Sequence, residues 1–259
     1  MKCDLYRRRR VCSCDLGEMK ILVVFDFDHT LVDDNSDTWV VRCAPEQSLP
    51  ASLKNSYKRG HWTDYMGKVL CYLRDQSIQP DTVRSVLETI PFTNGMVDLL
   101  TFISQNKNDI DCIIISDSNT LFIDWILQSR GVKGAIDSVF TNPASIDNCG
   151  YIGVQCFHSH QCEECPVNLC KLKVLNDFKE SQANSGIHYR TICYVGDGGN
   201  DFCPLKVLKE TDLVMPRKGY TLEKLLLKAK CENNAIKTQM VSWSCGGEIL
   251  QQLRDLIQQ

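Results

Sequence analysis

Short runs of apolar residues, each followed at once by a polar group, recur along this chain. The first run spans Ile21 to Phe25, and similar runs span Cys112 to Ile115 and Ile192 to Val195. Brief runs without alternation are typical of strands that are buried on both faces of a parallel sheet. We therefore predict three parallel strands that deliver polar groups to one edge of a sheet.

Helical patterns separate these strands. Apolar residues spaced over 96–103 follow an expected cap at Thr93 or Asn94, and a second pattern over 122–127 ends at Gly131. This alternation predicts an α/β fold with a Rossmann-like, doubly wound parallel sheet, whose ligand site lies beyond the carboxyl ends of the strands. Further strands are expected near 213–215 and 240–243. Helices are expected after Asp201, from Thr221 and at the end of the chain.

Residues 35–92 interrupt this alternation, because they contain no convincing buried strand. Their apolar residues recur at helical spacing, at Trp62, Tyr65, Met66, Val69, Leu70 and Leu73. We predict a small helical cap domain over 35–92, inserted into a catalytic core of residues 20–34 and 93–259. The aromatic stripe is interpreted as packing within the cap. A cap in this position would cover the site and exclude water.

Residues 1–19 contain a basic run, Arg7 to Arg10, without the apolar stretch of a signal peptide. We interpret them as a disordered, solvated tail. The chain has no apolar run near 18 residues, so we expect no membrane span. The net charge of -3 provides no overall positive field for nucleic acid or anionic lipid, and neither is expected as a partner.

Cysteine is frequent without reaching the density of a disulfide scaffold. The 15 cysteines in 259 residues make up about 6%, below the roughly 8–10% typical of short secreted scaffolds. We read them as reduced thiols, which predicts a cytoplasmic location.

Two aspartates flank one residue in Asp26-Phe27-Asp28, directly after the first predicted strand. Side chains two residues apart in an extended chain point to the same side, so both carboxylates can address one group of substrate atoms. Paired acids also commonly do no more than solvate a strand end. The pair becomes informative only together with the polar residues that follow the other strands.

Those residues occur in a definite order. His29-Thr30-Leu31 follows the pair, Ser116 follows the second strand, Lys171 begins a helix, and Gly-Asp-Gly-Gly-Asn-Asp over 196–201 follows the third strand. Each has an ordinary structural explanation, as a helix cap, a surface charge or a tight turn. In combination they resemble the haloacid dehalogenase (HAD) superfamily.

Further motifs of the chain are similar to one subgroup of that superfamily. The segment from Tyr57 to Met66 and the motifs FDFDHTLVDDNSDTW, PFTNGM, IIISDSN, HSHQCEECPVNLCK, YVGDGGNDFCP and MPRKGY are similar to the phosphoethanolamine/phosphocholine and pyridoxal-phosphate phosphatases. The similarity extends from about Met19 onward. Phe27, His29 and Trp39 favour the pyridoxal-phosphate branch.

The resemblance implies a covalent mechanism. Asp26 would be the nucleophile that takes up phosphorus as an aspartyl-phosphate. Asp28 would protonate the leaving oxygen and then deprotonate the attacking water. Dehalogenases of the superfamily lack this second aspartate, so its presence favours phosphoryl transfer.

Cations must accompany an anionic phosphoryl group that approaches a carboxylate. The resemblance assigns this role to Mg²⁺, Ser116 and Lys171. Lys173 is a rival for the lysine, but Lys171 directly follows Cys170 of the subgroup's pattern.

Magnesium prefers hard oxygen ligands. By resemblance these are the Asp26 carboxylate, the Asp28 backbone carbonyl and Asp197. Asp201 would support them, either on a metal-bound water or by holding Lys171.

Asp37 and Asp117 are assigned to substrate binding by the same resemblance, and carboxylates suit an ammonium or another donor. Both also fit caps or turns. For a quaternary amine, Trp39 or Tyr57 would offer an aromatic face, although either ring fits a core position equally well.

A second group of chemistry-bearing residues lies over 158–170. One CxxC with nearby imidazoles resembles the ligand spacing of a structural zinc site, and buried thiols in a polar loop are the alternative. The candidate zinc ligands are His158, His160, Cys162, Cys165 and Cys170.

We therefore predict a magnesium-dependent phosphatase. Its substrate is expected to be a small phosphorylated metabolite, because an insert this short would leave a closed pocket, and the resemblance to the pyridoxal-phosphate branch implies pyridoxal 5'-phosphate. Phosphoethanolamine or phosphocholine is the alternative substrate. A phosphomutase or phosphotransferase on the same scaffold is a second alternative. A catalytically silent metal-binding or interaction module is a third.

Overall fold

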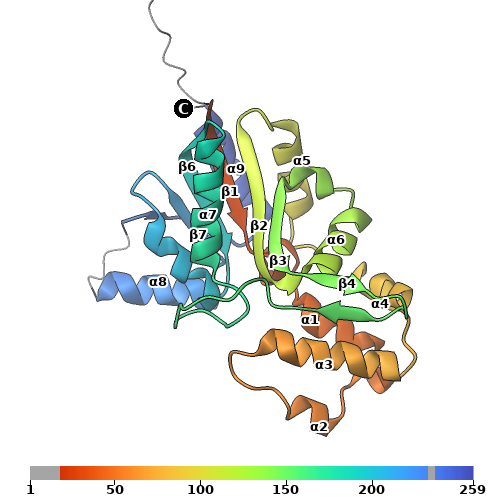
Figure 1. The fold of residues 1–259 in the computed structure, drawn as a ribbon. Helices are drawn as coiled ribbons and strands as arrows, with labels where there is room; N and C mark the ends of the chain where they lie inside the picture. The colour runs from red at the N-terminus through yellow and green to blue at the C-terminus, as the bar shows by residue number, and fades with distance from the viewer. Residues whose placement is uncertain (1–17, 233–236, 259) are drawn as a thin grey trace, which may run out of the picture.

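The computed structural model describes residues 18–232 and 237–258, and its centre is a six-stranded parallel sheet (Figure 1). The strands lie in the order β3-β2-β1-β6-β7-β8. All neighbouring pairs of this sheet are parallel. Their bounds are β1 (Glu18–Phe25), β2 (Ile110–Asn119), β3 (Ser138–Asn142), β6 (Ile187–Gly196), β7 (Leu213–Pro216) and β8 (Gln239–Met240).

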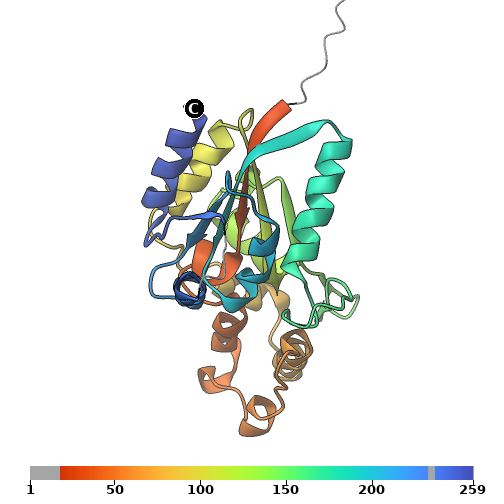
Figure 2. The same ribbon diagram turned by 90° about the vertical axis from the view of Figure 1, so that its left-hand side faces the viewer.

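Helices cover both faces of the sheet and form a three-layered core (Figure 2). Side chains of β1 alternate between the layers: Ile21, Val23 and Phe25 enter one apolar cluster, while Leu22 and Val24 enter the other. The first cluster includes residues of α5 (Met96–Gln105), α6 (Thr120–Ser129) and α9 (Gly246–Ile257). The second includes residues of α7 (Lys171–Asn184) and α8 (Thr221–Cys231).

The residues between Asn35 and Phe92 form helices, and these lie beyond the carboxyl ends of the core strands (Figure 1). An antiparallel bridge between Val32 and Phe92 joins the entry and exit of this segment. The helix over Trp62–Asp75 is amphipathic and buries Met66, Val69, Leu70 and Leu73. The elements are α1 (Ser36–Trp39), the turns η2 (Val40–Cys43) and η3 (Pro45–Gln47), α2 (Ala51–Lys54), α3 (Trp62–Asp75) and α4 (Pro80–Leu87).

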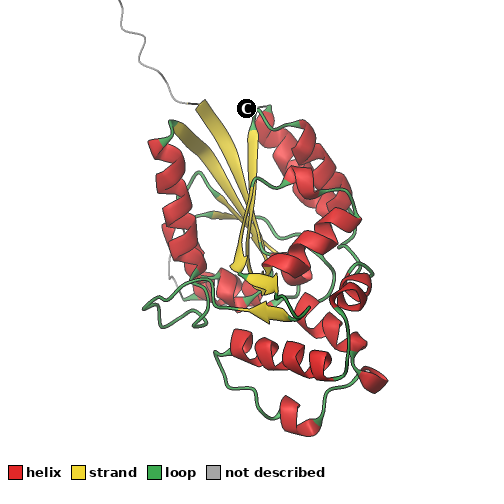
Figure 3. Cartoon of the chain, turned by 45° about the vertical axis from the view of Figure 1, so that its right-hand side comes forward, coloured by secondary structure: helices red, strands yellow, loops and turns green. Residues whose placement is uncertain are grey.

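Three strands were not predicted. β3 is a partly exposed edge strand, so it carries no continuous apolar run. The others form an antiparallel hairpin, β4 (Ala144–Ile146) and β5 (Ile152–Val154), which packs against α3 and lies between the sheet and the cap helices (Figure 3).

Some element boundaries also differ from the predictions. The N-cap of α5 is Gly95, with the left-handed φ of 77°, rather than Thr93 or Asn94. The start of α9 approaches this turn closely, since Gly246 donates its N–H to the Asn94 carbonyl at 2.8 Å and a Cβ at Gly95 would lie 2.9 Å from the Gly247 nitrogen. The helix expected after Asp201 is only the short 3-10 helix η6 (Cys203–Val207), which follows another short 3-10 helix, η5 (Gly199–Asp201).

The ends of the chain bear on two further predictions. Of the expected tail over 1–19, residues 1–17, including the arginine run, lie outside the described residues, and Glu18 and Met19 begin β1. Within residues 18–232 and 237–258, no helix has the length and apolarity that a membrane crossing requires.

Candidate active site

A pocket of about 330 Å³ lies where β1, β2 and β6 end and the cap begins. Six of the residues predicted for catalysis, metal binding or substrate binding line it: Asp26, Asp28, Asp37, Ser116, Asp117 and Asp197. Lys171 and Asp201 are buried beside them, Lys171 with 1% of its side chain exposed. The other lining residues are His29, Asn35, Trp62, Pro166, Asn168, Gly198 and Asn200.

Asp26 follows directly on β1 and is held at one carboxylate oxygen. Its Oδ1 accepts a hydrogen bond from the backbone N–H of Phe27 at 2.7 Å and lies 2.9 Å from Nζ of Lys171. Burial and the neighbouring Asp201 carboxylate raise the pKa of Asp26 well above its ordinary value, while Lys171 acts in the opposite direction. The site therefore favours a further positive charge near Asp26.

Asp28 lies in the turn η1 (Phe27–Leu31), in which His29 adopts the left-handed φ of 55°. The Asp28 carboxylate points toward the start of the cap, where Oδ1 accepts from the N–H of Ser36 at 2.8 Å and Oδ2 from Nδ2 of Asn35 at 3.3 Å. Burial raises the pKa of Asp28 to about 6, against the hydrogen bonds from Ser36. Such a carboxyl group is suited to gain and lose a proton near neutral pH.

Ser116 and Asp117 lie at the carboxyl end of β2. The Ser116 hydroxyl is buried at the pocket and accepts a hydrogen bond from the N–H of Ser118 at 3.2 Å. The Asp117 carboxylate accepts from Nδ2 of Asn168 at 2.9 Å and also from Nδ2 of Asn200. Two amides from different loops thus hold Asp117 in place.

Asp201 organises the turn after β6. Its Oδ1 accepts from Nζ of Lys171 at 2.7 Å and from the hydroxyl of Tyr194 at 2.9 Å. Its Oδ2 accepts from the N–H of Gly198 at 3.0 Å and of Asp197 at 3.2 Å. Of the two roles left open from the sequence, the contact with Lys171 is the one that this structure displays.

The aspartates that end β1 and β6 meet in space. One carboxylate oxygen from each of Asp26, Asp197 and Asp201 lies within 4.8 Å of the others. Burial, followed by the charge of Asp201, raises the pKa of Asp197 to about 7. Like charges 4 Å apart repel by about 4 kcal/mol at an effective dielectric constant near 20, and Lys171 supplies one positive charge to the group. Hard oxygen donors with excess negative charge are the environment that suits Mg²⁺.

The cap contributes Asp37 and Trp62 to the pocket. Trp62 donates its indole N–H to Oδ2 of Asp37 at 2.7 Å. Burial, followed by the charge of Asp28, raises the pKa of Asp37 to about 8. A carboxyl group and an indole ring therefore lie together on the side of the pocket that the cap provides.

The two aromatic candidates from the sequence, Trp39 and Tyr57, lie outside the pocket lining. Trp39 is buried in the cap, where its indole N–H donates to the carbonyl of Val86 at 3.0 Å. Tyr57 is 44% exposed and packs edge-on against Trp62, with ring centroids 5.5 Å apart.

Lys173 points away from the site. It is exposed and pairs with Asp177 one turn along α7, at 2.7 Å. Of the two candidate lysines, the fold brings Lys171 to the carboxylates.

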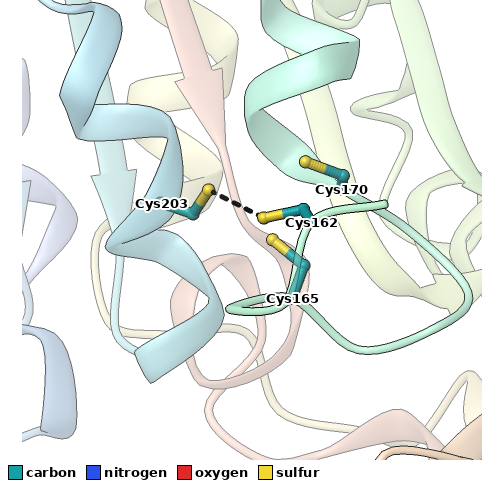
Figure 4. A group of neighbouring side chains, drawn as sticks. All are labelled: Cys162, Cys165, Cys170 and Cys203. Carbon is teal, nitrogen blue, oxygen red and sulfur yellow. Dashed lines mark hydrogen bonds between the residues drawn. The ribbon is translucent and has the colours of Figure 1, made fainter. Parts of the chain in front are cut away.

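The cysteine and histidine cluster lies outside the pocket and is only partly brought together. Cys162, Cys165 and Cys170 converge with Cys203 (Figure 4). The imidazoles hydrogen-bond to the loop backbone: His158 Nε2 with the N–H of Cys170 at 3.0 Å, and His160 Nε2 with the carbonyl of Pro166 at 2.7 Å. All cysteines in the described ranges are free thiols.

Several pocket residues were assigned no role from the sequence, among them Asn200, Asn168 and Trp62. Asn200 belongs to the Gly-Asp-Gly-Gly-Asn-Asp motif, in which only the aspartates were assigned roles. Asn168 lies within the cysteine-rich segment, where its neighbours suggested zinc instead. Trp62 was interpreted as packing, because helical periodicity does not reveal which member of a stripe overhangs a site.

Solved structures share this fold. A substrate-bound phosphoserine phosphatase matches with a TM-score of 0.57 at 16% identity, over 90% of this chain and 97% of that one. The chain therefore has a HAD-like α/β fold, which confirms the predicted fold class.

Sequence comparison gives the family. The chain belongs to the family described as Putative Phosphatase, whose sequence model matches residues 21–257. It is 52% identical over 242 residues to pyridoxal phosphate phosphatase PHOSPHO2 of Bos taurus, covering 93% of this chain and 100% of the relative. It is 37% identical over 242 residues to the phosphoethanolamine/phosphocholine phosphatase of Homo sapiens, covering 93% and 91%. The predicted resemblance is confirmed, and the chain is an enzyme of the phosphoric monoester hydrolase class.

Proposed function

We propose that this enzyme is a magnesium-dependent phosphatase that hydrolyses pyridoxal 5'-phosphate through an aspartyl-phosphate on Asp26. One observation carries the proposal: the Asp26 carboxylate stands at the end of β1, 2.9 Å from the Lys171 ammonium and within 4.8 Å of oxygens of Asp197 and Asp201. A buried carboxylate with a fixed cation beside it is suited to attack an anionic phosphoryl group.

In the first step, a bond forms between a carboxylate oxygen of Asp26 and phosphorus, and the ester bond to the leaving oxygen breaks. Oδ1 already accepts from Phe27 and Lys171, so we assign the attack to Oδ2. Asp28 gives its proton to the leaving alcohol. Its raised pKa, about 6, keeps a fraction of the free enzyme protonated near neutral pH.

In the second step, Asp28 takes a proton from water, the water oxygen bonds to phosphorus, and the bond to Asp26 breaks, releasing phosphate. Lys171 and the Ser116 hydroxyl are assigned to the phosphoryl oxygens. Asp201 is a positioning residue, because its oxygens hold Lys171 and the turn after β6.

Magnesium would be held by Asp26, the backbone carbonyl of Asp28 and Asp197, and when bound it supplies positive charge to the phosphoryl oxygens. Three converging buried carboxylates with Lys171 as their nearest cation fit this role.

The choice of substrate rests on the cap side of the pocket and on the relatives. The Trp62 ring offers a flat apolar face for an aromatic ring, and Asp37 offers a carboxyl group that can hydrogen-bond to the ring nitrogen. The relative named as a pyridoxal phosphate phosphatase is 52% identical, against 37% for the one named for phosphoethanolamine and phosphocholine. The same two residues also fit a small ammonium group, which makes these esters the second candidates.

The proposal is tested by measuring phosphate release from pyridoxal 5'-phosphate, phosphoethanolamine and phosphocholine, first with Mg²⁺ and then after the metal has been removed by a chelator. We expect the highest kcat/KM for pyridoxal 5'-phosphate and no turnover without the metal. Asp26→Asn should fold normally and release no phosphate. A higher kcat/KM for phosphoethanolamine or phosphocholine would overturn the substrate assignment.

Trp62→Leu tests the ring contact separately. It should lower kcat/KM for pyridoxal 5'-phosphate more than for phosphoethanolamine. Tyr65→Leu is the matched control, since Tyr65 lies on the same helix with its ring 5.3 Å from that of Trp62 but outside the pocket lining. Equal losses for both esters in Trp62→Leu would contradict a stacking role.

A further inference from the structure

Four cysteine sulfurs converge beside the active site from two segments that are distant in sequence (Figure 4). Cys162, Cys165 and Cys170 come from the loop before α7, and Cys203 comes from the start of η6. All four sulfurs lie within 4.8 Å of one another. The Cys162 and Cys203 sulfurs are 3.7 Å apart.

These separations match a tetrahedral metal site. Zinc binds thiolate at about 2.3 Å, which places the sulfurs of a tetrahedral set roughly 3.8 Å apart. A disulfide instead needs about 2.05 Å, and these cysteines are free thiols. We propose that Cys162, Cys165, Cys170 and Cys203 bind one structural Zn²⁺ ion.

Two imidazoles hydrogen-bond to the backbone of the cysteine loop beside the cluster. Nδ1 of His160 accepts from the N–H of Cys162 at 3.2 Å, and Nε2 of His158 accepts from the N–H of Cys170 at 3.0 Å. The imidazoles therefore orient the cysteine loop from outside.

An exposed ion pair also joins the two segments beside the cluster. The ammonium of Lys206, in η6, lies 2.6 Å from the Glu164 carboxylate. Four sulfur ligands leave no open position on zinc, so the site is structural rather than catalytic.

The position of the cluster indicates what the metal does. Cys170 directly precedes Lys171, and Cys203 lies two residues after Asp201. The ion would tie together the two segments that carry the Lys171–Asp201 pair, whose atoms are 2.7 Å apart. Loss of the ion should therefore lower the melting temperature and loosen the loops around the pocket.

Metal analysis of protein purified in Mg²⁺ buffer with a non-chelating reductant is the first test. We expect about one zinc per chain, as for a single closed site. Cys203→Ser and Cys165→Ser should lose the zinc and melt at a lower temperature. Cys156→Ser is the matched control, because Cys156 is an exposed thiol just upstream of the same loop, and it should keep the zinc. Retention of full zinc content by Cys203→Ser would overturn the four-cysteine site.

Two measurements on the unaltered protein test for metal binding by the four cysteines even if the serine variants fail to fold. Cobalt in place of zinc should give intense thiolate-to-metal charge-transfer bands and the d–d bands of a tetrahedral ion. Alkylation followed by mass spectrometry should find Cys162 and Cys165 protected until a chelator is added, while Cys149 and Cys156 react equally before and after. Metal-free protein with a disulfide between any of the four cysteines, or alkylation of Cys162 that a chelator does not change, would contradict the proposal.

Discussion

The ammonium of Lys171 lies 2.9 Å from Oδ1 of Asp26, and both groups are buried. The Asp201 carboxylate holds the same ammonium at 2.7 Å. Burial acts to lower the pKa of Lys171, but the two carboxylates outweigh it and the net shift is upward. The lysine therefore stays charged, and it is fixed beside the carboxylate that we assign as the nucleophile.

Replacing this lysine should affect both stability and catalysis. Lys171→Met leaves Asp26 and Asp201 without their cation, so we expect a loss of about 3–5 kcal/mol in the free energy of unfolding. We expect kcat to fall by about 10²–10³, as for the loss of one preorganised charge donor. Urea unfolding and phosphate release measure the two effects.

Lys173→Met is the matched control for that substitution. Lys173 lies on the same helix, is exposed and pairs with Asp177, and surface pairs of this kind contribute about 0.3–0.5 kcal/mol. Both measurements should remain close to those of the unaltered enzyme. A larger loss of activity in Lys173→Met than in Lys171→Met would reverse the assignment.

The acid and base role of Asp28 predicts a dependence on the leaving group. Asp28→Asn should lower kcat for an alkyl phosphate by about 10²–10⁴. With 4-nitrophenyl phosphate the first step should suffer less, because this leaving group departs without a proton. Burst kinetics would then show phosphorylated enzyme accumulating, since the base for the second step is missing. Equal losses in the first step with both substrates would argue against proton donation by Asp28.

Asp37 predicts a pH-dependent stability. Its pKa is about 8 in the folded protein and about 3.9 in an unfolded chain, so between these values the folded state binds more protons. Stability from this group is complete below the unfolded pKa and is lost as pH rises through the folded pKa. Asp37→Asn removes the titration and keeps an oxygen for the Trp62 indole. The melting temperature of Asp37→Asn, relative to that of the unaltered protein, should therefore increase as the pH rises from about 5 to about 8.

The control for this measurement is Asp81→Asn, at an exposed position in the first turn of α4. Melting curves of the three proteins in metal-free buffer give the comparison. A difference between Asp37→Asn and the unaltered protein that does not change with pH would refute the burial effect.

The residues that line the pocket at the sheet edge could be predicted from the sequence because the pattern there is local. Asp26, Ser116 and Asp197 each follow an apolar run closely, and parallel strands bring their carboxyl ends to one edge. β3 escaped prediction because it is an edge strand, and such strands lack the continuous apolar run of a buried one.

Contacts between distant segments were beyond the reach of these patterns. Cys203 joins cysteines more than 30 residues earlier in the chain, and Asn200 reaches Asp117 from another loop. The spacing of residues within one segment indicates which candidate ligands that segment contributes. It does not indicate which distant segment packs beside it. For this reason the candidate zinc ligands from the sequence included the histidines near the CxxC and did not include Cys203.

Direct detection of phosphorus on Asp26 tests the central claim. Asp28→Asn enzyme is mixed with 4-nitrophenyl phosphate and Mg²⁺, quenched in acid, reduced with borohydride and mapped by peptide mass spectrometry. Our account predicts conversion of Asp26, and of no other aspartate, to the reduced residue that marks an acyl phosphate. Unaltered enzyme in oxygen-18 water should release phosphate that carries the label. Reduction at a different aspartate, or labelled phosphate formed with Asp26 unmodified at every quench time, would contradict the account.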